Sequence, residues 1–173
     1  MKKVQSLSVI FATMLLCLNL YAGGPVDETE GAELVDLERI KTYEGFCRLV
    51  PDASTQNLVI TSESQYNSFI ERIPKYEIGM GDMPKSKDPL LKKPKINFNK
   101  YMLIVAINPD YLEYENLSII SIVRTGENAV VNYAIYQFDE YHVQQWPDGI
   151  SNYKAVLVDK VKGKVEFKRF SGL

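Results

Sequence analysis

One stretch of the chain has the apolar spacing of an amphipathic helix. Its apolar side chains recur at intervals of three and four residues, at Tyr66, Phe69, Ile70 and Ile73. This spacing places them on one helical face, and Pro74 ends the run. Ser62 and Gln65 form a capping box before it, in which the Ser62 hydroxyl accepts the Gln65 amide hydrogen and the Gln65 side chain reaches back to the Ser62 amide. We therefore predict a helix whose aromatic stripe packs in the core against a sheet.

The strongest strand signal is the apolar run 101–107, which reads Tyr-Met-Leu-Ile-Val-Ala-Ile. An unbroken apolar run of this length is typical of a strand that is buried on both faces, so we expect it at the centre of the sheet. Less regular alternation predicts one or two short strands within 34–48 and another at 57–60.

Two hairpins are predicted after the central strand. Residues 117–123 and 129–136 flank the first turn, and residues 153–158 and 164–168 flank Lys162-Gly163. The predicted fold class is α+β and mainly β: an antiparallel sheet or small β-sandwich with one amphipathic helix packed on it.

Residues 74–96 interrupt these regular elements. They contain four prolines, two glycines and six lysines against three acids, so no regular element can run far through them. Long loops within a compact domain are often functional, which makes this basic loop a candidate contact surface. A solvated insertion is the alternative interpretation.

The N-terminal segment has the order of a secretory signal peptide. Lys2 and Lys3 precede the apolar stretch 9–20, which is followed by Ala22-Gly23-Gly24. This stretch of twelve residues is too short for a membrane anchor, which needs about 20. We predict a signal peptide at 1–22, cleavage after Ala22, and a protein that is periplasmic or secreted.

The mature chain is predicted to begin with a flexible acidic leader, 23–33, before a single globular domain, 34–173. Cys17 follows Met-Leu-Leu inside the apolar stretch and so lacks the preceding small residue that a lipid-modified cysteine requires. Loss of Lys2 and Lys3 leaves 18 basic against 22 acidic side chains, a net charge of −4, which argues against a nucleic-acid partner.

Composition narrows the possible chemistry. The chain has 173 residues, 46% hydrophobic and 24% charged, as expected of a soluble globular protein, with eleven tyrosines but one histidine. Cleavage would leave Cys47 as the sole cysteine, which excludes an internal disulfide. Without phosphate loops or paired His and Cys residues, we expect no cofactor and no catalytic triad or zinc site.

Two weaker possibilities for chemistry involve Cys47 and the acidic loops. Cys47 shares a strand face with Tyr43 and Leu49, which indicates a packed thiol rather than a nucleophile paired with His142. Carboxylates gather where strands are predicted to end, and they could form a metal site, an acid/base pair or a solvated surface. These residues are Asp110, Glu113, Glu115, Asp139 and Glu140.

Aromatic residues in the connections between strands are the better candidate site, because core packing does not obviously require them there. They are Tyr111, Tyr114, Phe138, Tyr141 and Trp146. Amphipathic rings in loops favour contacts with proteins or sugars. Residues 110–148 carry seven acids and one base, whereas 154–169 carry six bases and two acids, an asymmetry that can steer a charged partner.

The order of the predicted strands, helix and turns along the chain resembles that of a known protein family. It comprises Glu44-Gly45-Phe46, the strand and capped helix 58–73, the aromatic lead-in and strand 97–107, a Tyr-rich hairpin, and the terminal Val156-Leu157-Val158-Asp159-Lys160 and Val165-Glu166-Phe167. Over 35–169 this pattern resembles the PrcB-like domain family, exported bacterial proteins related to a protease-complex accessory subunit. Where that family has a Thr-Gly-Gly-Tyr-like turn, this chain has 108–114, with Tyr111 at the place of the tyrosine. The resemblance implies a small β-rich accessory domain that binds a partner protein and has no catalytic residues to transfer.

These observations favour an exported, non-enzymatic binding or accessory module that engages another exported protein through its strand-connecting loops. The alternative is a protease inhibitor that presents a rigid loop to an active-site cleft. A third hypothesis is an enzyme in which Asp110, Glu113 or Asp139 converges with a second acid in a deep pocket.

Overall fold

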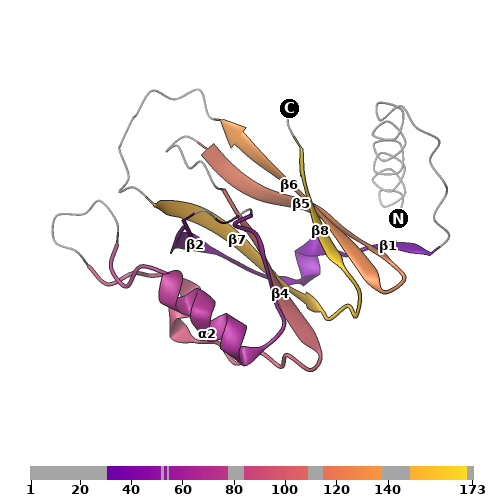
Figure 1. Cartoon of the computed structure of the whole chain (residues 1–173), viewed down its shortest axis with the longest axis horizontal. Helices are drawn as coiled ribbons and strands as arrows, with labels where there is room; N and C mark the ends of the chain where they lie inside the picture. The colour runs from indigo at the N-terminus through magenta and orange to yellow at the C-terminus, as the bar shows by residue number, and fades with distance from the viewer. Residues whose placement is uncertain are drawn as a thin grey trace, which may run out of the picture. The chain divides into compact units, whose positions relative to one another are not determined.

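A computed structural model describes residues 31–51, 53, 55–77, 84–108, 115–137 and 149–170. These residues form eight strands, one α-helix and two short 3-10 helices (Figure 1). In chain order they are β1 (Ala32–Leu34), η1 (Leu37–Arg39), β2 (Lys41–Arg48), β3 (Leu58–Ile60), α2 (Glu63–Arg72), η2 (Pro89–Lys92), β4 (Tyr101–Ile107), β5 (Glu115–Thr125), β6 (Asn128–Gln137), β7 (Ile150–Asp159) and β8 (Val165–Phe170). The protein is therefore α+β and mainly β, as predicted.

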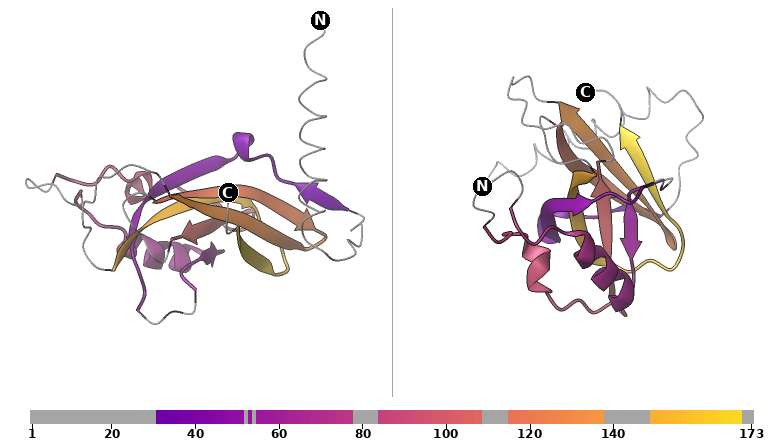
Figure 2. Two further views of the ribbon diagram at one scale, coloured as in Figure 1. Left: turned by 90° about the horizontal axis from the view of Figure 1, so that it is seen from above. Right: turned by 60° about the vertical axis from the view of Figure 1, so that its left-hand side comes forward.

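The strands form two four-stranded sheets. Sheet A has the order β1-β5-β6-β8, and sheet B has the order β2-β7-β4-β3. Every pairing is antiparallel except that of β6 with β8. The chain passes from sheet A to sheet B between β1 and β2 by way of η1 (Figure 2).

The inner faces of the two sheets share one apolar core. Sheet B contributes Met102, Ile104, Val156 and Val158 from its two inner strands, and sheet A contributes Ile122, Ala129 and Val131. Each of the seven side chains has at most 2% of its surface exposed. This shared core makes the fold a β-sandwich.

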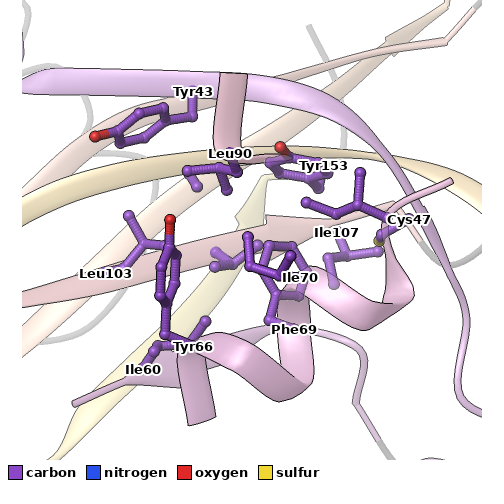
Figure 3. Close-up of a cluster of buried hydrophobic side chains, with 13 residues drawn as sticks. Tyr43, Cys47, Ile60, Tyr66, Phe69, Ile70, Leu90, Leu103, Ile107 and Tyr153 are labelled. Atoms are coloured by element: carbon purple, nitrogen blue, oxygen red, sulfur yellow. The ribbon is translucent and has the colours of Figure 1, made fainter. Parts of the chain in front are cut away.

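The other face of sheet B is covered by α2 and η2, so the domain has a third layer there (Figures 1 and 3). Tyr66, Phe69 and Ile70 of the helix pack on side chains that sheet B directs away from sheet A, among them Leu103, Val105, Ile107, Tyr153 and Ala155. Strand β4 is thus covered on both faces, which explains its unbroken apolar run and confirms its predicted central position.

The helix cap differs in one contact from the prediction. The Gln65 N–H donates to the Ser62 hydroxyl at 3.3 Å, as expected. The Gln65 side chain, however, accepts from the Thr61 N–H at 2.8 Å rather than from the Ser62 N–H. The Thr61 hydroxyl also donates to the same Gln65 oxygen, at 3.2 Å. This oxygen therefore stabilises the residue that precedes the helix cap.

The first predicted hairpin is confirmed, but the second is wrong. Strands β5 and β6 pair through the turn at Gly126, with a bulge between Ile119 and Ser121. By contrast β7 pairs with β2 and β4 in sheet B, while β8 crosses to sheet A and pairs in parallel with β6. The crossing connection is held by the β5–β6 turn, where the Gly163 N–H donates to the Glu127 carbonyl at 2.8 Å.

Strand β1 begins at Ala32, within the segment predicted to be the end of the acidic leader, and Ala32 pairs with Thr125. The predicted signal peptide, 1–22, lies outside the described residues. No helix in the described part of the chain is long and apolar enough to cross a membrane.

Candidate functional site

The five aromatic residues of the predicted site lie outside the described residues: Tyr111, Tyr114, Phe138, Tyr141 and Trp146. The residues that flank the two connections are described, and they converge. Glu115 pairs with Gln137 across β5 and β6, and the Asn108 N–H donates to the Asn152 carbonyl at 3.2 Å. Both connections, 109–114 and 138–148, therefore start and finish at the same end of the sandwich, which we call the loop-bearing end.

The loop-bearing end is held by buried polar contacts. Asn108 and Ser151 have no exposed surface, and the Ser151 hydroxyl donates to the Asn108 carbonyl. The Asn57 side chain accepts from the Ile107 N–H at 2.9 Å and so fixes the last residue of β4 from the side of β3. These contacts join β4, β7 and the segment before β3, which gives the connections a rigid base.

A second region, missed by sequence reasoning, is a pocket of about 210 Å³ beside β2. One wall is formed by β2, and the others come from segments on either side of residues 78–83. The lining residues are Glu44, Gly45, Phe46, Pro74, Tyr76, Glu77, Ser86, Lys87, Asp88 and Pro89. The two segments on either side of residues 78–83 pair with each other. The Glu77 N–H donates to the Pro84 carbonyl at 2.8 Å, and the Ser86 N–H donates to the Lys75 carbonyl at 2.9 Å.

Asp88 joins this pocket to the core. Its carboxylate accepts from the Leu90 N–H at 2.9 Å, which caps η2, and from the Tyr153 hydroxyl at 2.8 Å. Only 8% of Asp88 is exposed. Gly45 is needed beside it, because a Cβ at that position would lie 2.0 Å from Asp88 Oδ2.

Burial raises the pKa of Asp88 above its usual range. The hydrogen bonds from Leu90 and Tyr153 stabilise the carboxylate and oppose this rise, and the charge of Glu77 adds to it. The pKa of the Tyr153 hydroxyl is also raised, first by burial and then by the charge of Asp88. The hydroxyl therefore stays protonated and acts as a donor.

Cys47 is a packed strand thiol, as predicted. It has no exposed surface and lies in the core with Tyr43 and Tyr153 (Figure 3). Burial raises its pKa to about 12, so the thiol is not ionised near neutral pH. The proposed partner His142 lies outside the described residues, as do Asp110, Glu113, Asp139 and Glu140; Glu115 begins β5, but its side chain is not among those described. No group of three metal-ligating side chains occurs within the described ranges.

The predicted basic loop 74–96 is anchored in its described part. Leu90 of η2 is fully buried against α2 and β2, so this segment belongs to the third layer. Two features of the sequence could have indicated the pocket: a glycine inside a strand, at Gly45, and an Asp-Pro cap, at Asp88-Pro89. Their convergence with Tyr153 depends on the fold.

Comparison of the chain with models of known protein families, with curated protein sequences and with solved structures gave no significant match.

Proposed function

We propose that this chain is an exported, non-enzymatic protein-binding module that engages another exported protein through the connections 109–114 and 138–148. The observation that carries the proposal is the convergence of their flanking residues at the loop-bearing end of the sandwich. Two aromatic-bearing segments that share one base can act on a single partner surface.

The buried contacts of Asn108 and Ser151 support this role, because recognition loops work best when a rigid scaffold positions them. The resemblance to PrcB-like accessory domains points to the same class of function. The acidic character of residues 110–148 favours a partner whose contact surface is basic.

Replacement of Tyr111, Tyr114 and Trp146 by alanine tests the proposal. Affinity capture from the exported fraction of the native host should recover less of a specific partner with the triple variant than with the wild-type protein, while the melting temperature stays within about 2 °C. Leu34→Ala is the control, because Leu34 is an apolar residue that is 50% exposed and pairs with Val123, far along β5 from the loop-bearing end.

A large drop in melting temperature for the triple variant would show that the rings belong to the core and would contradict the proposal. Equal capture by the wild-type protein and the triple variant would do the same. Stoichiometric inhibition of a protease by the wild-type protein, lost in the triple variant, would redefine the module as an inhibitor.

A further inference from the structure

One edge of sheet A is formed by β8, whose strand partner among the described residues is β6 (Figure 2). This strand has six residues, whereas β1, at the opposite edge of the same sheet, has three. An edge strand presents alternate backbone N–H and C=O groups away from its partner. The β8 edge is therefore the side of sheet A on which an additional strand could pair.

The hydrogen bonds between β6 and β8 show which residues of β8 face outward. Val165 pairs with Ala129, and the Ala129 N–H donates to the Lys164 carbonyl at 2.9 Å. In a parallel pair of this phase the hydrogen bonds run to the residues on either side of Val165, so even-numbered residues direct their backbone groups to β6. Odd-numbered residues direct theirs outward, and these are Val165, Phe167 and Arg169.

The outward N–H and C=O groups of these three residues have no hydrogen-bond partner within the described ranges. An added antiparallel strand could therefore bond to each of them. The Val165 and Phe167 side chains face the core between the sheets and are only partly buried. An apolar side chain opposite Phe167 on an added strand would cover its exposed part, so pairing at this edge would extend the core without displacing any contact described above.

The charges of β8 define the kind of strand that fits. Lys168 and Arg169 are exposed, and neither forms an ion pair or a side-chain hydrogen bond in the described part of the chain. Glu166 lies on the same face as Lys168, but it is paired with Lys164 at 2.8 Å. Two adjacent cations, one directed to each face of the sheet, are thus left for an acidic strand. A second copy of β8 would instead add two more unpaired cations to the same edge.

We infer that the outer edge of β8 binds an extended acidic segment of a partner protein by antiparallel strand addition, with two consecutive carboxylates of that segment opposite Lys168 and Arg169. In this register an apolar residue follows the two acids and lies opposite Phe167. The surface includes neither of the connections 109–114 and 138–148. Its test uses the purified chain and a peptide, so the outcome does not depend on the proposed function.

Fluorescence anisotropy with a labelled peptide, acetyl-Thr-Glu-Glu-Val-Thr-Val-Thr-amide, tests the inference. At about 0.15 M salt we expect saturable binding that weakens as salt is added. Replacement of both glutamates by glutamine should weaken it about fivefold, because two exposed ion pairs are lost. Lys168→Gln combined with Arg169→Gln should have the same effect on the glutamate peptide. The glutamine peptide should bind the wild-type protein and this double variant equally, as expected if the charges interact directly.

Lys92→Gln is the matched control, because it removes one positive charge from an exposed position on η2, in the layer that covers sheet B. It should leave binding of the glutamate peptide unchanged. An equal loss of affinity for Lys92→Gln and Lys168→Gln would show that the peptide responds to net charge alone and would overturn the inference.

The backbone contribution is tested by N-methylation of the peptide. Methylation of both valine amides removes donors on the pairing side and should abolish saturable binding. Methylation of the second glutamate amide and the middle threonine amide, which face away from β8 in this register, should preserve it. Equal effects of the two patterns, or absence of saturable binding at about 1 mM peptide, would overturn the inference. A dimer of the unliganded chain that the peptide dissociates would also overturn it and assign this edge to a second copy.

Discussion

The Tyr153 hydroxyl donates a hydrogen bond to the Asp88 carboxylate, at 2.8 Å from Oδ2 and 2.9 Å from Oδ1, although 65 residues separate the two in the chain. Tyr153 lies within sheet B, and Asp88 caps the short helix η2. The contact therefore ties the described part of 74–96 to the centre of the fold. Asp88 also lines the pocket beside β2.

Tyr153→Phe should destabilise the protein by about 1–3 kcal/mol, because it leaves the buried Asp88 carboxylate without one of its donors. Equilibrium unfolding in urea would measure the loss. An unchanged free energy of unfolding would show that the carboxylate finds another donor.

Tyr66→Phe should have the opposite effect and increase the free energy of unfolding. The Tyr66 hydroxyl is buried and has no hydrogen-bond partner among the described residues, and it points from α2 toward Leu90 and Tyr43 (Figure 3). Its removal abolishes the cost of burying an unpaired polar group, so we expect a gain of about 1 kcal/mol. The same urea measurement applies, and a loss of stability would show that the hydroxyl has a partner.

The pH dependence of stability should carry a contribution from Asp88. Its pKa is raised in the folded protein, so the folded state binds this proton more tightly than the unfolded chain does. Asp88 therefore stabilises most below the unfolded pKa, about 3.9, and this contribution is lost as pH rises through the folded pKa. In urea unfolding from acidic to neutral pH, the wild-type protein should lose stability relative to Asp88→Asn over that interval. A difference in stability between the wild-type protein and Asp88→Asn that does not change with pH would contradict the raised pKa of Asp88.

Gly45→Ala should destabilise by at least about 2 kcal/mol, because the new methyl group would overlap Asp88 Oδ2. The cost should fall in an Asp88→Ala background, where the carboxylate is absent. A double-mutant cycle based on melting temperatures or urea unfolding measures this coupling. Equal costs in both backgrounds would place the strain elsewhere.

Cys47 should be inert in the folded protein. Its pKa of about 12 and complete burial predict no reaction with a thiol reagent at about pH 8, in a chain that lacks 1–22 and so contains no other cysteine. In denaturant, one thiol per chain should react with the reagent. Rapid reaction without denaturant would show that β2 opens locally.

Local patterns in the sequence predicted the elements whose signals are local. The apolar run of β4, the stripe of α2 and the β5–β6 hairpin each follow from neighbouring residues. The pairing of β8 does not, because Val165 and Phe167 alternate equally well on either sheet. Turn residues such as Lys162-Gly163 specify a reversal of the chain but not the sheet to which it returns.

The pocket was beyond sequence reasoning for a related reason. Asp88, Gly45 and Tyr153 come from three elements, and each has an ordinary local interpretation as a cap, a strand glycine or a core aromatic residue. Only the arrangement of η2 over β2 and β7 places them in contact. For the loop aromatics the structure describes the flanking residues alone, so their role in recognition stays a prediction.

The parallel pairing of β6 with β8 affects the order in which the protein can form. Sheet A lacks an edge strand, and its face toward sheet B lacks Phe167, until residues 165–170 have left the ribosome. A chain that is synthesised from its N-terminus therefore cannot complete the sandwich while residues 165–170 are still within the ribosome. Completion of sheet A thus waits for the release of residues 165–170.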